Sequence, residues 1–170
     1  MNMHSTISPM LNIGGRLLSL ERPLVMGILN ATTESFYEAS RTPSCEDLVS
    51  RARSMMGEGA TILDVGACST KPGLAPVSET EEIHRLSTVL ETLRRELPDV
   101  ILSVDTFRAS VAERCVREYG VQMVNDVYGG QADERMFATI ADLQVPYVLT
   151  YDGNRKGNKT VAYRIDRMKD

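Results

Sequence analysis

Short apolar runs alternate with helical stripes along the first 150 residues of the chain. Five runs of four to six residues are expected to be β-strands, and they cover residues 24–29, 61–65, 100–104, 121–124 and 146–149. Runs that are apolar at nearly every position are typical of strands buried on both faces of a parallel sheet. Each of the first four runs is followed by a helical pattern, so the alternation predicts a parallel sheet with right-handed crossovers.

The segments between these runs repeat apolar residues at the 3.6-residue period of an α-helix. Ser44 with Asp47 is close to a capping box, and Ser78 with Glu81 forms one, so these pairs open the first two helices. Gly120 ends the third helix, which we expect over residues 109–119. The apolar residues expected to face the sheet are Leu48, Ala52, Met55 and Met56 in the first helix, Ile83, Leu86, Leu90, Leu93 and Leu97 in the second, and Met136, Phe137, Ile140 and Leu143 in the last.

Two segments lie outside this alternation. Residues 11–20 (LNIGGRLLSL) predict a β-hairpin in which Gly14 and Gly15 form the two-residue turn. Residues 151–170 are polar and turn-like, and we expect them to form a poorly ordered tail. We therefore expect one domain over residues 1–150, followed by that tail.

Composition and charge narrow the class of protein. At 170 residues the chain is long enough for one well-buried domain. A net charge of −4 gives no reason to expect binding to nucleic acid or to an anionic membrane. No apolar run approaches the ~20 residues of a membrane span, and residues 1–9 lack the pattern of a signal peptide. Three widely spaced cysteines fit a reducing cytoplasm, and two histidines are too few for a His-rich metal site.

Polar side chains occupy the ends of four predicted strands. They are Asn30, Asp64, Asp105 and the pair Asn125 and Asp126. The carboxyl ends of parallel strands meet at one edge of the sheet, where ligand sites of α/β folds are built, so we expect all of these side chains to project toward one face. The alternative is that they cap the strands and hold the loops that follow.

The residue types indicate which ligands such a site would take. Asn30 offers a neutral oxygen, which suits a Mg²⁺ ion that keeps most of its waters and binds a substrate phosphate. The loop at 69–71 (STK) offers hydroxyl groups and a cation to an anionic oxygen. Asp105 and Asn125 together suit a heterocycle, because a carboxylate accepts from N–H groups and an amide both donates and accepts. The chain has neither a GxGxxG nor a GxxxxGK[ST] motif, which disfavours a dinucleotide or nucleoside triphosphate.

These strand ends resemble the signatures of one family, the dihydropteroate synthases. Residues 27–36 (GILNATTESF) resemble its first signature, G-I-L-N-x-T-P-D-S-F, and residues 64–73 (DVGACSTKPG) resemble its second, D-[IV]-G-x-x-S-[TS]-R-P-G. Residues 103–106 (SVDT) and 124–130 (VNDVYGG) look like the third and fourth strand ends. The resemblance covers residues 11–150 and implies the N-terminal half of a TIM-type (β/α)8 barrel, with an N-terminal hairpin, about four βα units and a fifth strand.

The resemblance implies an enzyme of folate synthesis. These synthases join 6-hydroxymethyl-7,8-dihydropterin pyrophosphate to p-aminobenzoate and release pyrophosphate. By resemblance, Asn30 would bind the Mg²⁺ ion that neutralises the leaving group. Asp105 and Asn125 would be the catalytic residues that hold the pterin ring while positive charge develops at its methylene.

The two loops after the first strands would bind the rest of the substrates. By resemblance, Thr70 and Lys71 would contact the pyrophosphate, while Phe36, Ser69 and Pro72 would border the p-aminobenzoate pocket. Both loops would act as lids that exclude water from the reactive cation.

Three positions depart from the family pattern in these loops. Thr33 replaces a Pro that would fix φ, and Glu34 replaces a shorter Asp. Lys71 replaces an Arg, which keeps the charge and loses the bidentate fork. We expect weaker closure of the first loop from Thr33 and Glu34.

Length is the larger departure. The resemblance implies a further pterin-binding Asp, a Lys and an Arg-x-His from later strands, and the 170 residues hold no counterpart. A half barrel would leave strands 24–29 and 146–149 as open edges, so we expect a fragment, a homo-oligomer that completes the barrel, or marginal stability. Three functions stay open on these grounds: a synthase-type transferase, a non-catalytic half barrel that binds pterin or phosphate, and a generic flavodoxin-like binding domain.

Overall fold

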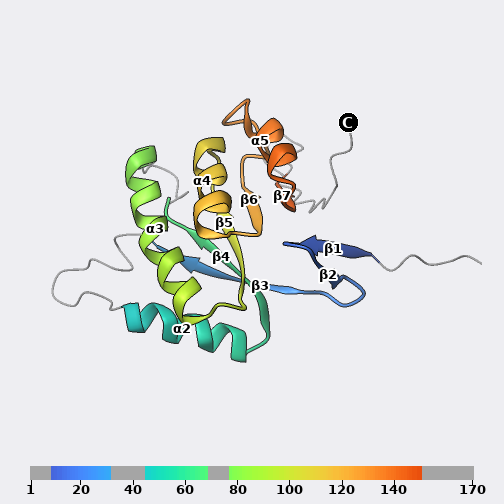
Figure 1. Cartoon of the computed structure of the whole chain (residues 1–170), viewed down its shortest axis with the longest axis vertical. Coiled ribbons are helices and arrows are strands. Elements are labelled where there is room, and N and C mark those ends of the chain that lie inside the picture. The colour runs from blue at the N-terminus through green and yellow to red at the C-terminus, as the bar shows by residue number, and fades with distance from the viewer. Residues whose placement is uncertain (1–8, 32–44, 69–76, 151–170) are drawn as a thin grey trace, which may run out of the picture.

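A five-stranded parallel sheet is the centre of the computed structural model, which describes residues 9–31, 45–68 and 77–150. The strands are β3 (Val25–Asn30), β4 (Ala60–Gly66), β5 (Ile101–Asp105), β6 (Met123–Asp126) and β7 (Tyr147–Leu149). They lie side by side in sequence order, and each pair is parallel. The connecting helices are α2 (Cys45–Gly57), α3 (Glu79–Glu96), α4 (Ala109–Tyr119) and α5 (Met136–Leu143) (Figure 1). This order is that of a partial (β/α) barrel, which confirms the predicted fold class.

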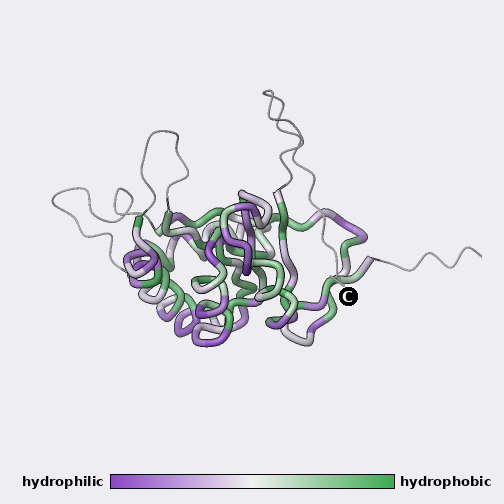
Figure 2. Tube along the Cα trace, turned by 90° about the horizontal axis from the view of Figure 1, so that it is seen from above, coloured by the Kyte–Doolittle hydropathy of each residue, from purple (hydrophilic) through white to green (hydrophobic). Residues whose placement is uncertain are grey.

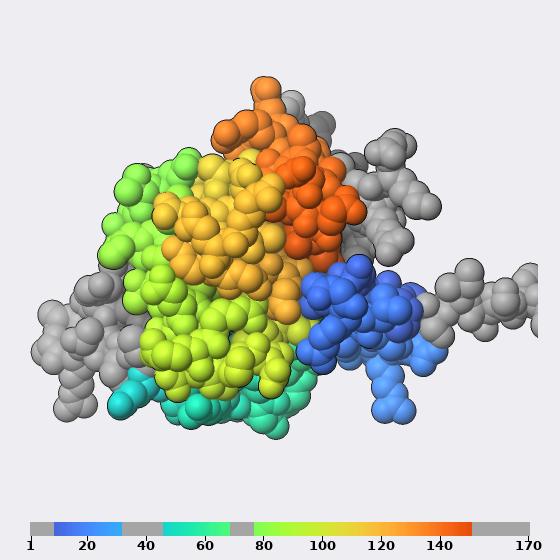
Figure 3. Space-filling model, in the orientation of Figure 1, coloured from blue at the N-terminus to red at the C-terminus, as the bar shows by residue number. Residues whose placement is uncertain are grey.

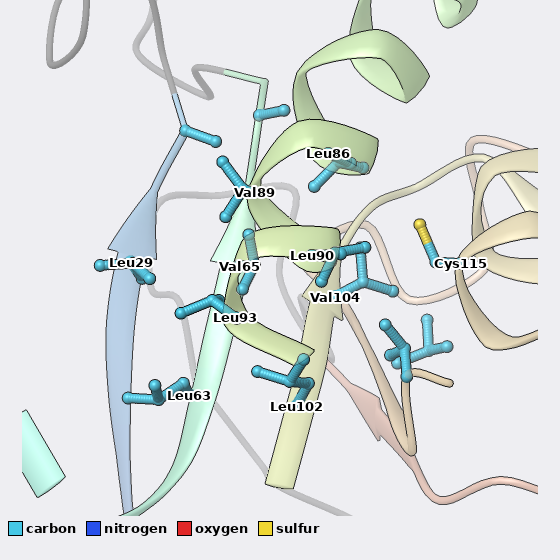
Figure 4. Packing of buried hydrophobic residues seen from close by; sticks show 14 of the residues in the cluster. Leu29, Leu63, Val65, Leu86, Val89, Leu90, Leu93, Leu102, Val104 and Cys115 are labelled. Carbon is cyan, nitrogen blue, oxygen red and sulfur yellow. The ribbon is translucent and has the colours of Figure 1, made fainter. Parts of the chain in front are cut away.

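The larger core lies between the sheet and the helices, on the face that we call the outer face. Leu63 and Val65 of β4 point to this side, and they are joined by Leu86, Leu90 and Leu93 of α3 (Figure 4). All five side chains are essentially without solvent exposure. Hydrophilic segments lie along the outward sides of the helices (Figure 2). The apolar stripe predicted for the second helix is therefore confirmed as the buried face of α3.

A smaller core lies on the opposite, inner face of the sheet. It is closed by a hairpin of β1 (Met10–Ile13) and β2 (Arg16–Ser19), which packs directly against the rest of the described chain (Figure 3). Leu11 and Ile13 of the hairpin pack in one cluster with Ile62, Ile101 and Met123 of the sheet. The sequence predicted the hairpin. It did not predict that the hairpin covers the inner face of the sheet at the amino ends of the strands.

Local signals correctly placed the hairpin turn, the start of α3 and the end of α4, whereas Ser44 of the other predicted cap lies outside the described residues. Gly14 and Gly15 form the hairpin turn with φ of 54° and 87°, which glycine adopts without strain. Ser78 Oγ accepts a hydrogen bond of 3.2 Å from the backbone N–H of Glu81 at the start of α3. Gly120 ends α4 in the left-handed conformation.

Two apolar residues expected to face the sheet do not. Met56 and Phe137 are each 37% exposed. Met56 follows Met55, which packs on the core, and the ~100° turn between successive helical residues carries Met56 away from it. Phe137 lies at the margin of α5, where its ring meets the Tyr147 ring edge-on at a centroid distance of 6.0 Å.

Strand β3 is less buried than its apolar sequence suggests. Leu29 is buried on the outer face, whereas Val25 and Ile28 are 56% and 62% exposed. Within the described residues β3 pairs with β4 alone, so it is the edge of the sheet. The hairpin cluster reaches Met26 on the inner face of β3 and leaves Ile28 uncovered. The expectation of a strand buried on both faces is therefore wrong for β3.

Candidate functional site

One row of residues crosses the sheet at the carboxyl ends of its strands. Asn30 pairs in register with Gly66, Gly66 with Asp105, Asp105 with Asn125, and Asn125 with Val148. We call these five residues the carboxyl-end row. Successive residues of a strand face opposite sides, and the neighbouring Leu29, Val65, Val104 and Val124 belong to the outer core. The carboxyl-end row therefore lies on the inner face. Three of the predicted site residues, Asn30, Asp105 and Asn125, share that face.

The inner face changes from apolar to polar along the strands. Its first row, next to the hairpin, is Met26, Ile62 and Ile101, and its second row is Ile28, Asp64, Ser103 and Met123. The carboxyl-end row lies beyond these and carries two amides and one carboxylate. The hairpin thus closes the apolar end, while polar groups gather at the other end.

Gly66 leaves space for the carboxylate of Asp105. A Cβ atom at position 66 would lie 3.3 Å from Asp105 Oδ2 and 3.4 Å from Asp105 Cβ. Both distances are tighter than most side-chain contacts, so a larger residue would displace the carboxylate. The glycine therefore lets the Asp105 side chain lie over β4 within the carboxyl-end row.

Asn125 is held by a carboxylate two strands away. Its Nδ2 donates to Asp64 Oδ2 over 2.8 Å, across β5. Asp64 is 3% exposed, and its other oxygen, Oδ1, is buried without a hydrogen-bond partner among the described residues, as is Ser103 Oγ. The sequence marked Asp64 only as one of the polar strand ends and did not connect it with Asn125.

Burial and neighbouring charge change the acidity of the site. Burial raises the pKa of Asp105 to about 7, and the charges of Asp64, Asp126 and Glu82 add to this rise. Burial also raises the pKa of Asp64, while the nearby Ser103 hydroxyl and Asn125 amide oppose that change. The inner face therefore concentrates negative charge that a ligand with N–H donors or positive charge would stabilise.

Asp126 faces away from the other strand-end residues. Its Oδ2 accepts from Tyr147 Oη over 2.6 Å and from the Gly130 N–H over 2.7 Å, and its Oδ1 accepts from the Tyr128 N–H over 2.8 Å. The expectation that all polar strand ends project toward one face is wrong for Asp126, because adjacent residues of β6 point to opposite faces. For this residue the alternative, a strand end that holds its loop, is the right one.

A buried ion pair lies next to Asp105 and was not foreseen. Glu82 of α3 has no solvent exposure, and it accepts from Thr106 Oγ1 over 2.7 Å and pairs with the Arg108 guanidinium. Arg108 Nη2 also donates to the Val77 carbonyl over 2.7 Å. These contacts join the start of α3 to the segment that follows Asp105 and so fix the end of β5.

The remaining predicted site residues fall outside the described ranges. They are Phe36, Ser69, Thr70, Lys71 and Pro72, together with the variant positions Thr33 and Glu34. Asn30 is described, and its exposed side chain lies at the β3 end of the carboxyl-end row. Of the residues predicted to act on ligands, the structure therefore places Asn30, Asp105 and Asn125 in one row.

Residues 9–31, 45–68 and 77–150 contain neither a cluster of metal-binding side chains nor a membrane-spanning helix. No group of three or more His, Cys, Asp or Glu side chains is arranged to hold a metal ion within these ranges. None of the helices in the same ranges has the length and apolar character needed to cross a membrane.

The sequence is similar to that of named folate enzymes. It is 41% identical over 132 residues to the dihydropteroate synthase of Bacillus subtilis, which covers 78% of this chain and 46% of that protein. It is 43% identical over 133 residues to a folate synthesis bifunctional protein of Arabidopsis thaliana, over 77% of this chain and 27% of that protein. The chain thus spans about half the length, or less, of the relatives it matches.

Solved structures share the same arrangement of strands and helices. The dihydropteroate synthase of Xanthomonas albilineans with 4-aminobenzoic acid matches with a TM-score of 0.75 and 38% identity, over 89% of this chain and 54% of that one. The Burkholderia cenocepacia dihydropteroate synthase complexed with 7,8-dihydropteroate matches with a TM-score of 0.69 and 33% identity, over 91% and 50%. These matches confirm the resemblance found in the strand-end signatures.

The family model described as "Pterin binding enzyme" matches residues 26–168, which include every strand of the parallel sheet except the first residue of β3. Sequence signatures, strand order and family match agree over the same part of the chain. The chain belongs to the family of pterin-binding enzymes.

Proposed function

We propose that this chain forms the pterin side of a dihydropteroate synthase-type active site. The reaction would join 6-hydroxymethyl-7,8-dihydropterin pyrophosphate to p-aminobenzoate and release pyrophosphate. The observation that carries the proposal is the carboxyl-end row, in which Asn30, Asp105 and Asn125 share one face at the carboxyl ends of parallel strands. Relatives named dihydropteroate synthase, and structures of such enzymes with 4-aminobenzoic acid or 7,8-dihydropteroate, support this choice of substrates.

Asp105 and Asn125 are the residues that would hold the pterin ring. They are register neighbours on β5 and β6, so both can reach one small heterocycle. The Asp105 carboxylate accepts from ring N–H groups, and the Asn125 amide matches an edge that both donates and accepts. When pyrophosphate leaves, positive charge spreads from the methylene into the ring, and a fixed carboxylate next to it stabilises that charge. Such preorganised groups are commonly worth about 3 kcal/mol of barrier.

Asn30 is the residue that would contact a Mg²⁺ ion. Its exposed amide oxygen is one neutral ligand, which fits an ion bound mainly by water and substrate phosphate rather than by a cage of carboxylates. When bound, the ion supplies positive charge that neutralises the departing pyrophosphate. Asn30 would orient that phosphate end at the β3 side of the row, away from Asn125.

The two loops complete the proposal. Thr70 and Lys71 would bind pyrophosphate oxygens, and Phe36, Ser69 and Pro72 would border the p-aminobenzoate pocket. The family resemblance supports these roles. We further propose cytoplasmic location, small-molecule substrates without nucleic-acid or membrane partners, and assembly into a homo-oligomer, on the grounds of charge, cysteine content and the exposed edge at Ile28.

The second candidate is a non-catalytic half barrel that binds pterin or phosphate. The chain spans about half of the synthases it matches, and the later Asp, Lys and Arg-x-His contacts implied by the resemblance have no counterpart in its 170 residues. This candidate predicts that the carboxyl-end row binds a pterin or a phosphate without turnover.

A pyrophosphate-release assay on the full chain separates the two candidates. Pterin pyrophosphate, p-aminobenzoate and Mg²⁺ are supplied, and product formation that Asp105→Ala abolishes supports the transferase. Binding of the pterin substrate without turnover supports the half-barrel binder. A chain that neither binds nor turns over the substrate would contradict both.

A further inference from the structure

The hydrogen bond from Asn125 to Asp64 links the carboxyl-end row to the row beneath it. Asp64 pairs in register with Ser103, and Asn125 pairs with Asp105, so the bond runs diagonally over β5. Ser103 lies between the two strands and is fully buried. Its small side chain leaves room for the Asn125 amide to reach β4.

This bond fixes which way round the Asn125 amide points. An amide carries a donor on one side and an acceptor on the other, whereas a carboxylate only accepts. Asp64 therefore selects the orientation in which Nδ2 faces β4. The carbonyl oxygen Oδ1 of Asn125 and its second N–H are then left for a ligand, since no hydrogen bond to either is recorded among the described residues.

Asp64 is poorly suited to a purely structural role. It is 3% exposed, and among the described residues its buried Oδ1 has no hydrogen bond of good geometry, although the Ser103 hydroxyl is near enough to lower the pKa of Asp64. A buried polar atom that makes no hydrogen bond lowers stability, and an apolar side chain like those of Ile28 or Met123 in the same row would pack there without that cost. The carboxylate is therefore better explained by what it does to Asn125.

We propose that Asp64 is a positioning residue that sets the hydrogen-bond polarity of Asn125, and through it the preference for a heterocycle bearing an amino group over one bearing a carbonyl oxygen at the same place. This inference rests on the proposed pterin site. Asn125 Oδ1 accepts from the amino group of a pterin, whereas a carbonyl oxygen there meets Oδ1 with two acceptors and no hydrogen between them.

The test compares two ring systems that differ in the group at carbon 2 of the pyrimidine ring and in whether the adjacent ring nitrogen carries a hydrogen. Pterin carries an amino group at carbon 2 of the pyrimidine ring, and lumazine carries a carbonyl oxygen there. Dissociation constants for both are measured on the full chain by quenching of ligand fluorescence. We expect the wild-type chain to bind pterin more tightly than lumazine. In Asp64→Asn the freed Asn125 amide can turn to meet either ligand, so we expect the ratio of the lumazine dissociation constant to the pterin dissociation constant to fall about tenfold.

Two further variants separate this effect from a general loss of structure. Ser103→Ala alters the same buried row without removing the partner of Asn125, and we expect it to keep the wild-type ratio. The double variant Asp64→Asn with Asn125→Asp exchanges the pair, so position 125 again directs an acceptor oxygen at the ligand, although without the second N–H of the wild-type amide. We expect it to restore the preference for pterin, which a merely damaged fold would not do. Thermal melting checks that each variant is folded at the assay temperature.

The outcomes distinguish this inference from the function it rests on. A folded Asp64→Asn chain that keeps the wild-type ratio overturns the positioning role and leaves the pterin site standing. A double variant that fails to restore the preference overturns it as well. A wild-type chain that binds neither compound overturns the proposed function, and the inference with it.

Discussion

The two faces of the sheet are built by the same strands and treat polar groups in opposite ways. On the outer face, Asp126 accepts three hydrogen bonds, and the leucines of α3 cover the sheet without solvent exposure. On the inner face, one oxygen of Asp64 has no hydrogen-bond partner among the residues that the structure describes, and burial raises the pKa of Asp105 to about 7. The outer face therefore holds the fold, while the inner face keeps hydrogen-bonding capacity for a ligand.

Truncating the outer core gives the largest effect on stability. Leu90 is fully buried, so Leu90→Ala is expected to lower the free energy of unfolding by about 2–5 kcal/mol. Ile28 on the inner face is 62% exposed, and Ile28→Ala is expected to change it by only about 0.5 kcal/mol. Urea denaturation measures both. Equal losses would show that the inner face of β3 is covered in solution.

Removing the partner of Asp126 is expected to affect stability and not the ligand. Tyr147→Phe deletes the 2.6 Å hydrogen bond to Asp126 and should cost about 1.5–3 kcal/mol, as for bonds to charged groups. Pterin affinity should stay at the wild-type level, because Asp126 faces the helices. A large fall in affinity with an intact fold would place Asp126 in the site.

The acidity of Asp105 should couple pterin binding to pH. Its pKa is about 7 against 3.8 for an ordinary Asp, so the ionised form that accepts N–H groups is lost as the pH falls through 7. Below that pH, affinity should drop about tenfold per pH unit. Calorimetric titrations from pH 8 to pH 5.5 measure this, with Asp105→Asn as the variant that should lose the dependence.

Stability should change with pH in the opposite direction to pterin affinity. The folded pKa of Asp105 lies above its ordinary value, so the folded state binds the proton more tightly than the unfolded state does. The contribution of Asp105 to stability therefore falls as the pH rises from about 4 to about 7. Thermal melts of the wild type and Asp105→Asn should diverge with rising pH, and parallel curves would contradict a buried, raised-pKa carboxyl.

Filling the space beside Asp105 gives the smallest effect. Gly66→Ala places a Cβ 3.3 Å from Asp105 Oδ2, which shifts the carboxylate by a few tenths of an ångström. We expect a several-fold loss of pterin affinity with little change in melting temperature, since a misplacement of about 1 Å can cost about a hundredfold and this shift is a fraction of that. Unchanged affinity would show that Asp105 does not need its position over β4.

Local sequence signals predicted much of the fold. The Gly14–Gly15 turn, the Ser78 cap and the Gly120 helix end depend on neighbours within a few residues, and all three are confirmed. The strand order followed from the strand–helix alternation. The side of the sheet that each side chain faces was harder to predict. Asn125 and Asp126 were treated as one strand end, although only one of two adjacent strand residues can face the site.

Contacts between distant parts of the chain could not be predicted in this way. Asp64 and Asn125 are 61 positions apart, and Glu82 and Arg108 are 26 apart, so neither pair leaves a periodic signal. Glu82 also lies in the acidic first turn of a helix, where a carboxylate is ordinarily exposed. Only the approach of the segment after β5 buries it.

The most direct test compares carboxylates on the two faces. Asp105→Asn and Asp126→Asn each remove one negative charge, and pterin binding is measured for both at pH 8, well below their melting temperatures. Our account predicts that Asp105→Asn weakens binding at least tenfold, while Asp126→Asn binds like the wild type and only melts earlier. Equal affinities in the two variants would contradict the assignment of the inner face as the pterin site.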